Sequence, residues 1–142
     1  MNTETPILLD IVLTGESATI DFGRQLAKHL QAGDILCLWG DLGTGKSTLA
    51  RAVIRSWLGP ETDAPSPTFT LVQTYDAPDF EIWHMDLYRL EEPEEALELG
   101  IEDAFAEAVS LIEWPDRLGG YLPPDRLDVT LCHTETVGEG RR

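Results

Sequence analysis

Apolar and polar residues in the first part of the chain follow strand-like and helix-like patterns in turn. The continuous apolar run from Ile35 to Trp39 is typical of a strand buried in a parallel sheet. An earlier apolar run, from Ile7 to Leu13, predicts a first strand. A second helix is expected from about Lys46 to Leu58, where Gly59-Pro60 stops it. A first helix is expected before Gly33, because small and apolar residues recur at helical spacing at Ile20, Gly23, Ala27 and Leu30.

The rest of the chain predicts four further strands. Phe69 to Tyr75 and Phe80 to Asp86 alternate in polarity, and Ala77-Pro78-Asp79 between them indicates a hairpin turn. Val109 to Trp114 and Arg126 to Cys132 are the other two. Strands that alternate with helices indicate an α/β sheet with covering helices. The length of 142 residues is that of one domain, which we expect to span residues 1–142.

An acidic segment interrupts these strands. From Glu91 to Glu107 there are eight acidic residues and no basic one. Leu97, Ile101, Phe105 and Ala108 are spaced to share one helical face there. The segment is either a solvated acidic surface on one or two short helices or a docking surface for a basic partner.

A glycine-rich loop lies between the apolar strand and the second helix. Residues 40 to 47 read Gly-Asp-Leu-Gly-Thr-Gly-Lys-Ser and fit the phosphate-loop pattern G-x-x-x-x-G-K-[ST] in the strand–loop–helix context that it requires. Glycines let the backbone N–H groups turn inward, and with the positive helix end these donors hold a β-phosphate. Lys46 is expected to reach the β- and γ-phosphates, and the Ser47 hydroxyl to bind Mg²⁺. The expected nucleotide-binding residues are Asp41, Leu42, Gly43, Thr44, Gly45, Lys46, Ser47 and Thr48.

The phosphate loop defines the fold class more closely, but it does not specify the nucleotide base, which we infer by excluding guanine. The chain is predicted to be a P-loop NTPase-like α/β domain with a mostly parallel central sheet and an antiparallel hairpin. Guanine-specific switches use an Asn-Lys-x-Asp motif, and the only asparagine is Asn2. ATP is therefore favoured as the nucleotide.

A phosphate loop also needs a carboxylate at the end of a neighbouring strand, where it holds the metal or the metal's water shell. Asp86 and Glu113 each end an apolar strand, although either could be a surface acid among 26 acidic residues. Thr68, in the sequence Ser66-Pro67-Thr68-Phe69, is either part of a loop that senses the γ-phosphate or a turn hydroxyl bonded to its own backbone.

Two further side chains near these carboxylates allow two interpretations each. His84 is either a packed strand histidine or a catalyst. Arg89 is either a phosphate-binding finger or a surface residue paired with Glu91 or Glu92.

Composition constrains the partners and the compartment. The net charge is −16, the only lysines are Lys28 and Lys46, and the arginines are scattered along the sequence, so we expect the chain not to grip tRNA by itself. No apolar run is long enough to span a bilayer, and no secretory signal is expected at the N-terminus. Cys37 and Cys132 fall in apolar stretches and are expected to be buried free thiols. These features predict a cytoplasmic protein. We also expect the chain to be monomeric when alone.

Taken in order, four motifs resemble the TsaE (YjeE) family, the ATPase component of bacterial tRNA threonylcarbamoyladenosine synthesis. The resemblance runs from about Ile20 to Leu131. Its motifs are the phosphate loop at 40–47, Ser-Pro-Thr-Phe-Thr-Leu-Val at 66–72, His-Met-Asp-Leu-Tyr-Arg-Leu at 84–90 and Glu-Trp-Pro at 113–115. The phosphate loop alone is shared by a very large superfamily, whereas all four in this order and spacing are specific.

The resemblance implies an Mg²⁺-dependent ATPase that is weak alone and associates with the TsaB–TsaD pair, which modifies the adenosine next to the tRNA anticodon. It implies that tRNA is reached only through these partners. It also implies that Lys46 is the phosphate lysine, Ser47 a Mg²⁺ ligand and Glu113 a second metal-linked acid. Asp86 would hold the water shell or the attacking water. Thr68 would lie in the nucleotide-sensing loop, and Trp114 would lie beside the site.

Two departures from the family pattern accompany this resemblance. Ser47 stands where the family often has threonine, which preserves the hydroxyl. The chain stops at Gly140-Arg141-Arg142, where many relatives continue, so its C-terminus looks truncated and any nucleotide contact there is left open.

Two other functions compete with the ATPase interpretation: a small-molecule kinase on the same scaffold, and a module that binds ATP without hydrolysing it. The sequence contains no long arginine-rich insertion of the kind a kinase lid requires.

Overall fold

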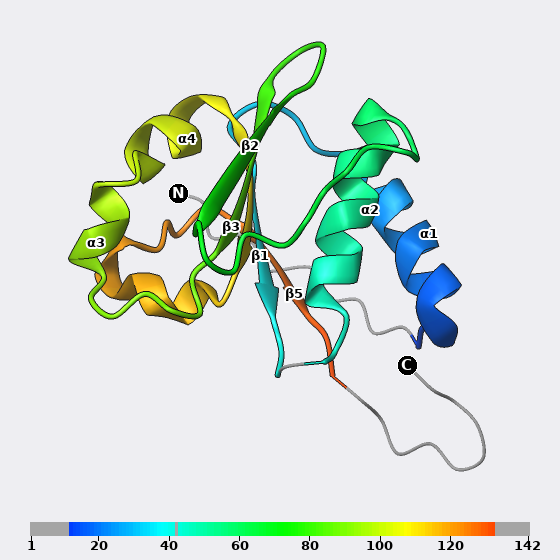
Figure 1. The fold of residues 1–142 in the computed structure, drawn as a ribbon, viewed down its shortest axis with the longest axis horizontal. Helices are drawn as coiled ribbons and strands as arrows, with labels where there is room; N and C mark the ends of the chain where they lie inside the picture. The colour runs from blue at the N-terminus through cyan, green and yellow to red at the C-terminus, as the bar shows by residue number, and fades with distance from the viewer. Residues whose placement is uncertain (1–11, 42, 133–142) are drawn as a thin grey trace.

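The computed structural model describes residues 12–41 and 43–132 and places a single sheet between two groups of helices (Figure 1). The strands are β1 (Ile35–Trp39), β2 (Val72–Asp76), β3 (Glu81–Asp86), β4 (Val109–Glu113) and β5 (Leu127–Thr130). The helices are α1 (Gly15–Ala27), α2 (Lys46–Leu58), α3 (Glu94–Leu97) and α4 (Ile101–Glu107), with a 3₁₀ helix η1 (Pro115–Tyr121). None of the helices in this part of the chain is long and apolar enough to cross a bilayer.

The sheet has the strand order β2-β3-β4-β1-β5, and the α/β fold predicted from the sequence is confirmed. β3, β4, β1 and β5 run parallel, whereas β2 pairs with β3 in the antiparallel sense. Parallel strands end at the same edge of a sheet, so β1, β3 and β4 deliver their carboxyl ends side by side. Asp86 is aligned with Glu113, and the phosphate loop follows β1 at the same edge.

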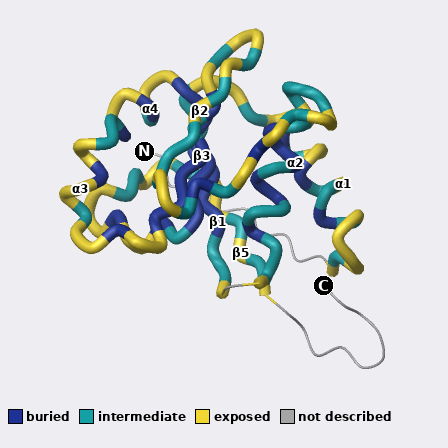
Figure 2. The backbone as a smooth tube through the Cα atoms, viewed as in Figure 1, coloured by how far each residue is buried: buried dark blue, intermediate teal, exposed yellow. Residues whose placement is uncertain are grey.

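The two faces of the sheet are covered by different helices (Figure 1). Successive side chains of a strand point to opposite faces. Leu36 and Leu38 of β1 therefore pack in the cluster that α2 covers. Cys37, between them, packs in the second cluster with residues of α3, α4 and η1. Figure 2 shows that buried residues are concentrated in the central strands and along α2.

Helices α1 and α2 lie against each other on one side of the sheet (Figure 1). Gly23 makes this close approach possible, because a Cβ at this position would lie 2.7 Å from Cβ of Ala52 and 3.1 Å from the carbonyl oxygen of Leu49. The helix α2 itself begins and ends at the residues that the sequence predicts, Lys46 and Leu58.

Three expectations about local structure are wrong or only partly right. The strand predicted from Phe69 begins only at Val72, because the preceding residues form a turn in which Leu71 has a positive φ of 69° and Phe69 is 80% exposed. The acidic segment forms two short helices separated by Gly100, whose φ is 90°, so the single helical face including Leu97 does not form. Most of the predicted strand from Ile7 lies outside the described residues, and Val12 and Leu13 are not in a strand.

The two cysteines differ in exposure. Cys37 is a buried free thiol, as expected, because β1 is central in the sheet. Cys132 is free but exposed, so its predicted burial is wrong. The reason is that β5 ends at Thr130 and is the edge strand.

The basic residues of α1 and α2 are not scattered in space. Four of them line one groove between the two helices, with a volume of about 610 Å³: Arg24, Lys28, Arg51 and Arg55. Glu16 and Asp21 lie in the same groove. Among the described residues, only Arg24 of these four forms an ion pair, to Asp21 at 3.4 Å. Basic residues that are scattered along the sequence are therefore gathered at this surface, beside two acidic residues.

Candidate functional site

The phosphate loop joins the end of β1 to the start of α2, which is the strand–loop–helix placement that the motif requires. Gly43 and Gly45 have positive φ values of 81° and 106°, a conformation that favours glycine. Gly45 is the residue that caps α2, so the loop leads directly into the positive end of that helix. Thr44 donates its hydroxyl to the carbonyl oxygen of Asp41 at 2.8 Å, which closes the turn. Leu42, also predicted to contact nucleotide, lies outside the described residues.

Lys46 is buried at the head of α2 and its ammonium group is held by the loop. The Nζ atom donates to the carbonyl oxygens of Gly40 and of Asp41, the latter at 3.1 Å. It also lies 3.9 Å from the centre of the Trp114 ring, a cation–π contact. Burial lowers the pKa of Lys46 from its ordinary value, whereas the nearby carboxylates, first Glu113 and then Asp86, act in the opposite direction. A phosphate group would supply the counter-charge that this buried cation requires.

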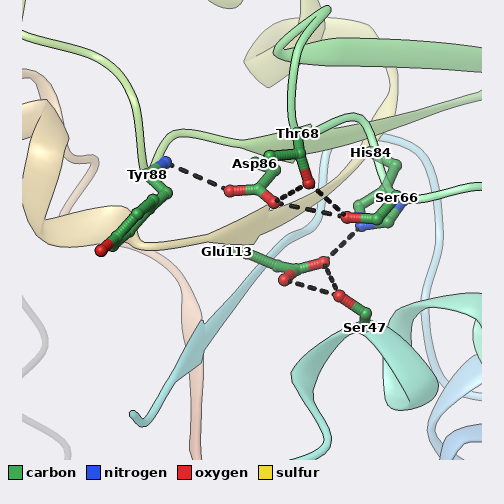
Figure 3. A network of polar contacts seen from close by, with 7 residues as sticks. All are labelled: Ser47, Ser66, Thr68, His84, Asp86, Tyr88 and Glu113. Atoms are coloured by element: carbon green, nitrogen blue, oxygen red, sulfur yellow. Dashed lines mark hydrogen bonds and ion pairs between the residues drawn. The ribbon is translucent and has the colours of Figure 1, made fainter. Parts of the chain in front are cut away.

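Ser47, Glu113 and His84 form a chain of polar contacts beside the lysine (Figure 3). The Ser47 hydroxyl lies 3.0 Å and 3.1 Å from the two carboxylate oxygens of Glu113. The Nε2 atom of His84 lies 2.7 Å from Oε2 of the same carboxylate. All three residues come from different elements, α2, β4 and β3. Glu113 is only 3% exposed, so its orientation is fixed by these two neighbours.

Asp86 organises a second set of contacts at the end of β3 (Figure 3). Its Oδ2 atom accepts from the hydroxyls of Ser66 and Thr68, both at 3.3 Å. Its Oδ1 atom accepts from the backbone N–H of Tyr88 at 3.1 Å. Thr68 is therefore tied to Asp86 by its side chain, and the alternative in which it bonds only its own backbone is not what forms. Ser66 and Tyr88 were not predicted as site residues.

One cavity of about 560 Å³ unites these groups. The lining residues are Gly43, Gly45, Lys46, Ser47, Thr48, Ser66, Thr68, Asp86, Tyr88, Arg89, Glu113 and Trp114. The structure thus brings together Lys46, Thr68, Asp86 and Glu113, the four residues predicted to be catalytic. Asp41 and Thr44 do not line the cavity; they shape the loop instead.

The side chains at the cavity suit a metal ion that takes most of its ligands from water or phosphate. Within residues 12–41 and 43–132 no cluster of three or more His, Cys, Asp or Glu residues could enclose an ion. The Ser47 hydroxyl and the Glu113 carboxylate are already adjacent, and Asp86 lines the same cavity. Oxygen ligands from one or two carboxylates and a hydroxyl are the set that Mg²⁺ takes beside substrate phosphates. The residues present therefore fit a magnesium–nucleotide site.

For Arg89 and His84, the sequence analysis left two interpretations each, and the structure can be compared with both. The Arg89 guanidinium lies 4.5 Å from the centre of the Phe69 ring and lines the cavity. The described residues contain no ion pair between Arg89 and Glu91 or Glu92. His84 is packed and fully buried, as the structural interpretation expected, and it also contacts a site carboxylate directly. No sequence signal specified that contact, because it depends on the register of β3 against β4.

The sheet order and the strand–loop–helix unit at β1 and α2 define a P-loop NTPase fold. The family model described as "Threonylcarbamoyl adenosine biosynthesis protein TsaE" matches residues 13–142, and the chain belongs to this family.

Similar proteins agree with that assignment. A Rickettsia bellii protein named tRNA threonylcarbamoyladenosine biosynthesis protein TsaE is 42% identical over 120 residues, covering 84% of this chain and 83% of that protein. A Haemophilus influenzae protein of the same name is 39% identical over 114 residues, covering 76% of this chain and 72% of that protein. The crystal structure of Bacillus subtilis YdiB matches with a TM-score of 0.70 at 26% identity, covering 86% of this chain and 74% of that structure.

Proposed function

We propose that this chain is a Mg²⁺-dependent ATPase that supports threonylcarbamoyladenosine modification of tRNA. The observation that carries the proposal is the contact between the Ser47 hydroxyl and the Glu113 carboxylate, beside the buried ammonium group of Lys46. This arrangement places a metal-binding pair and a phosphate-binding cation at the head of one helix. Membership of the TsaE family supports the tRNA-modification role.

Each residue has a distinct role in this proposal. The N–H groups of the loop and Lys46 bind the phosphates, and Lys46 exchanges its carbonyl acceptors on Gly40 and Asp41 for phosphate oxygens. Ser47 and Glu113 would hold Mg²⁺, which would supply positive charge beside the phosphates. Chemistry at the γ-phosphate needs little from the protein beyond position and charge.

Asp86 is the group we assign to the nucleophile. It lies in the same cavity, and its carboxylate accepts hydrogen bonds from Ser66 and Thr68 of the adjoining loop. A carboxylate so placed orients a water molecule, either one in the metal's shell or the one that attacks. We assign Thr68 the nucleotide-sensing role, because its hydroxyl links the loop to the Asp86 carboxylate in the cavity. If the water belongs to the metal's shell, Asp86 is a third metal-linked residue after Ser47 and Glu113.

A partner completes this site in the proposal. Arg89 lines the cavity, but none of the described arginines forms a hydrogen bond with Lys46, Ser47 or Glu113. In phosphoryl transfer, an arginine that stabilises the transferring phosphate is often supplied in trans. The TsaB–TsaD pair implied by the family resemblance is the partner we propose. The chain then works in the cytoplasm, is monomeric alone and meets tRNA only through that pair.

Calorimetric titration of the isolated chain tests the nucleotide site. ATP is expected to bind in the presence of Mg²⁺ and more weakly when the metal is chelated, because Ser47 and Glu113 act through it. GTP should bind less tightly, since the chain has no guanine-recognition motif. Absence of ATP binding by the folded chain, or equal affinity with and without Mg²⁺, would contradict the proposal.

A further inference from the structure

The groove between α1 and α2, which we call the basic groove, locally reverses the sign of the charge of the chain. The net charge is −16, yet four of the ten lysines and arginines line this groove: Arg24, Lys28, Arg51 and Arg55. Only two carboxylates, those of Glu16 and Asp21, line it with them. None of the four cations lines the nucleotide cavity, so phosphate binding there does not account for them.

The spacing of the basic residues on the two helices brings them together. Arg24 and Lys28 are four residues apart on α1, so they share one helical face. Arg51 and Arg55 have the same spacing on α2. The close approach of the helices at Gly23 brings the two pairs into one groove. Like charges at this spacing destabilise a helix, so the stability of the fold does not explain the arrangement.

The basic side chains are available to an external anion. Lys28 is exposed, and neither Lys28 nor Arg51 forms an ion pair within residues 12–41 and 43–132. Arg55 donates from Nε to a backbone carbonyl oxygen just beyond α2 at 3.0 Å, which orients its guanidinium without neutralising it. Arg24 pairs with Asp21, but both side chains are exposed, and such a pair contributes little to stability. An incoming anion therefore has little internal pairing to displace.

The shape of the basic groove favours a run of phosphate groups over one small anion. A site for one phosphate usually gathers backbone N–H donors around a point, as the phosphate loop does. Here the cations are spread along two helices around a volume of about 610 Å³. A nucleic-acid backbone presents regularly spaced phosphates, which arginine and lysine contact without reading the bases. A peptide rich in carboxylates would match the charge equally well, but membership of a family named for tRNA modification favours RNA.

The acidic residues of the chain do not prevent this contact, because many of them lie elsewhere. The acidic segment from Glu91 to Glu107 includes α3 and α4, which lie on the other side of the sheet from α1 and α2 (Figure 1). At physiological salt, exposed charges more than about 8 Å apart are largely screened from one another. The net charge therefore opposes the approach of free RNA, whereas the basic groove can still pair with phosphates that are already in contact with it.

The basic groove also adjoins the nucleotide cavity. Thr48 lines both of them and lies in the first turn of α2. It directly follows Ser47, whose hydroxyl contacts the Glu113 carboxylate. Arg51 and Arg55 come one and two turns later on the same helix. One helix therefore carries a metal-linked hydroxyl at its start and two groove cations farther along.

We propose that the basic groove binds the phosphate backbone of the tRNA that the TsaB–TsaD pair holds. This inference rests on the proposed function, because the pair delivers the RNA. Placing the tRNA and this chain on the same pair raises the effective concentration of phosphates at the groove towards about 1 mM, at which contacts with a Kd of about 0.1 mM are occupied. The basic groove thus adds phosphate contacts in the assembled complex, and the lone chain still does not bind tRNA appreciably.

Fluorescence anisotropy of labelled tRNA tests this. Its affinity is measured for the TsaB–TsaD pair alone and for the pair saturated with the full-length chain, a non-hydrolysable ATP analogue and Mg²⁺, at several salt concentrations. The test variant combines Lys28→Gln with Arg51→Gln, and a second variant, Lys28→Arg with Arg51→Lys, keeps both charges. Ser17→Asp with Gln31→Glu is the matched control, because it lowers the net charge equally at exposed positions outside the groove. Binding of each variant to the pair, and the ATP affinity of each lone variant, are measured in parallel.

We expect the wild-type chain to raise the affinity of the pair for tRNA and to steepen its dependence on salt. Each phosphate contact adds about 0.7–0.9 to the slope of log affinity against log salt concentration. The double glutamine variant should therefore lose about 1.4–1.8 of that slope, and its complex should bind tRNA at least about 10-fold more weakly at about 0.1 M salt. The charge-retaining variant and the matched control should stay within about 2-fold of the wild type. Lone-chain ATP affinity should also stay within about 2-fold, which excludes unfolding as the cause.

The outcomes separate this inference from the function on which it rests. Equal tRNA affinity and salt slope for the wild type and the double glutamine variant, with both bound to the pair, would contradict RNA binding in the groove and leave the proposed function standing. If the double glutamine variant no longer joins the pair, the groove binds an acidic protein surface and the RNA assignment is wrong. A fall in tRNA affinity on adding the wild-type chain would mean that chain and RNA compete, which also overturns the inference. A wild-type chain that does not join the pair in any nucleotide state would overturn both the partner assignment and this inference.

Discussion

Nε2 of His84 lies 2.7 Å from Oε2 of Glu113, and both side chains are buried between β3, β4 and α2. With its proton on Nε2, the imidazole donates to the carboxylate that also accepts from Ser47. His84 does not line the cavity, so we assign it a positioning role. Groups that orient a metal ligand typically change metal affinity or activity about 10- to 100-fold when removed.

His84→Leu should therefore reduce Mg²⁺-dependent ATP affinity about 10-fold, because the Glu113 carboxylate loses its buried donor. His84→Gln should retain most of the affinity, since an amide N–H can take the place of Nε2–H. Calorimetry with and without Mg²⁺ provides the comparison, and the thermal midpoint of each variant reports its folding. Equal loss of affinity in both variants, or a loss that does not depend on the metal, would contradict the positioning role.

The buried ammonium group of Lys46 predicts a second result. Lys46→Ala should weaken ATP binding about 10- to 150-fold, the effect of losing a charge-assisted hydrogen bond of about 1.5–3 kcal/mol. Because burial lowers the pKa of Lys46, its charged form is lost at a lower pH than in an exposed lysine. ATP affinity should then fall as the pH rises into the alkaline range. An alkaline titration in which Lys46→Arg loses affinity as the wild type does would show that another group is responsible.

The two carboxylates should separate in function. Glu113→Ala should weaken Mg²⁺-dependent ATP binding, because Glu113 contacts Ser47. Asp86→Ala should reduce hydrolysis more than binding, because its partners are the Ser66 and Thr68 hydroxyls rather than the phosphate loop. Glu113→Gln and Asp86→Asn are the isosteric controls. Normal turnover by both alanine variants in the presence of TsaB–TsaD would mean that the acids are misassigned.

The thiol of Cys37 predicts how stability changes with pH. Burial raises the pKa of Cys37 from 9.0 to about 12, with a smaller contribution from Asp128 in the same direction. The native state thus holds its proton after the unfolded state has released it. This contribution to stability is fully present below about pH 9 and is lost as the pH rises from there towards 12.

Urea unfolding at several pH values measures this loss of stability at alkaline pH. The free energy of unfolding of the wild-type chain should fall more steeply above pH 9 than that of Cys37→Ala, by up to about 1.4 kcal/mol per pH unit. Cys132→Ala is the matched control, because it removes the exposed thiol. A thiol reagent at neutral pH should modify Cys132 in the native chain and Cys37 only after unfolding. Parallel stability curves for the wild type and Cys37→Ala would contradict the assigned burial effect.

Elements with strong local signals could be predicted from the sequence. β1 and α2 have the predicted bounds, because a continuous apolar run, a glycine loop and Gly59-Pro60 mark them without ambiguity. Convergence of Asp86 and Glu113 also followed from the sequence, since both end strands of a parallel sheet. The start of the strand predicted at Phe69 was wrong. Phe69 alternates with later apolar residues as in a strand, but the Leu71 N–H donates to the Pro67 carbonyl oxygen and a turn forms instead.

Relationships between distant elements could not be predicted. The contact of His84 with Glu113 needs the register of two strands, which no local pattern specifies. The basic groove depends on how α1 rotates against α2, which Gly23 permits by removing a side chain at the crossing. The groove is the surface to examine if the isolated chain binds tRNA at physiological salt. In that case Arg51 and Arg55 are the residues to replace by acidic ones.

Steady-state phosphate release tests the central claim most directly. It is measured for this chain alone, for the TsaB–TsaD pair alone and for the mixture with tRNA, after binding has been confirmed separately. We expect slow release by the lone chain and release by the mixture well above the sum of the two parts, with no such excess in Lys46→Ala. A mixture that equals the sum of its parts would contradict partner-activated hydrolysis and would identify the chain as a module that binds ATP without hydrolysing it.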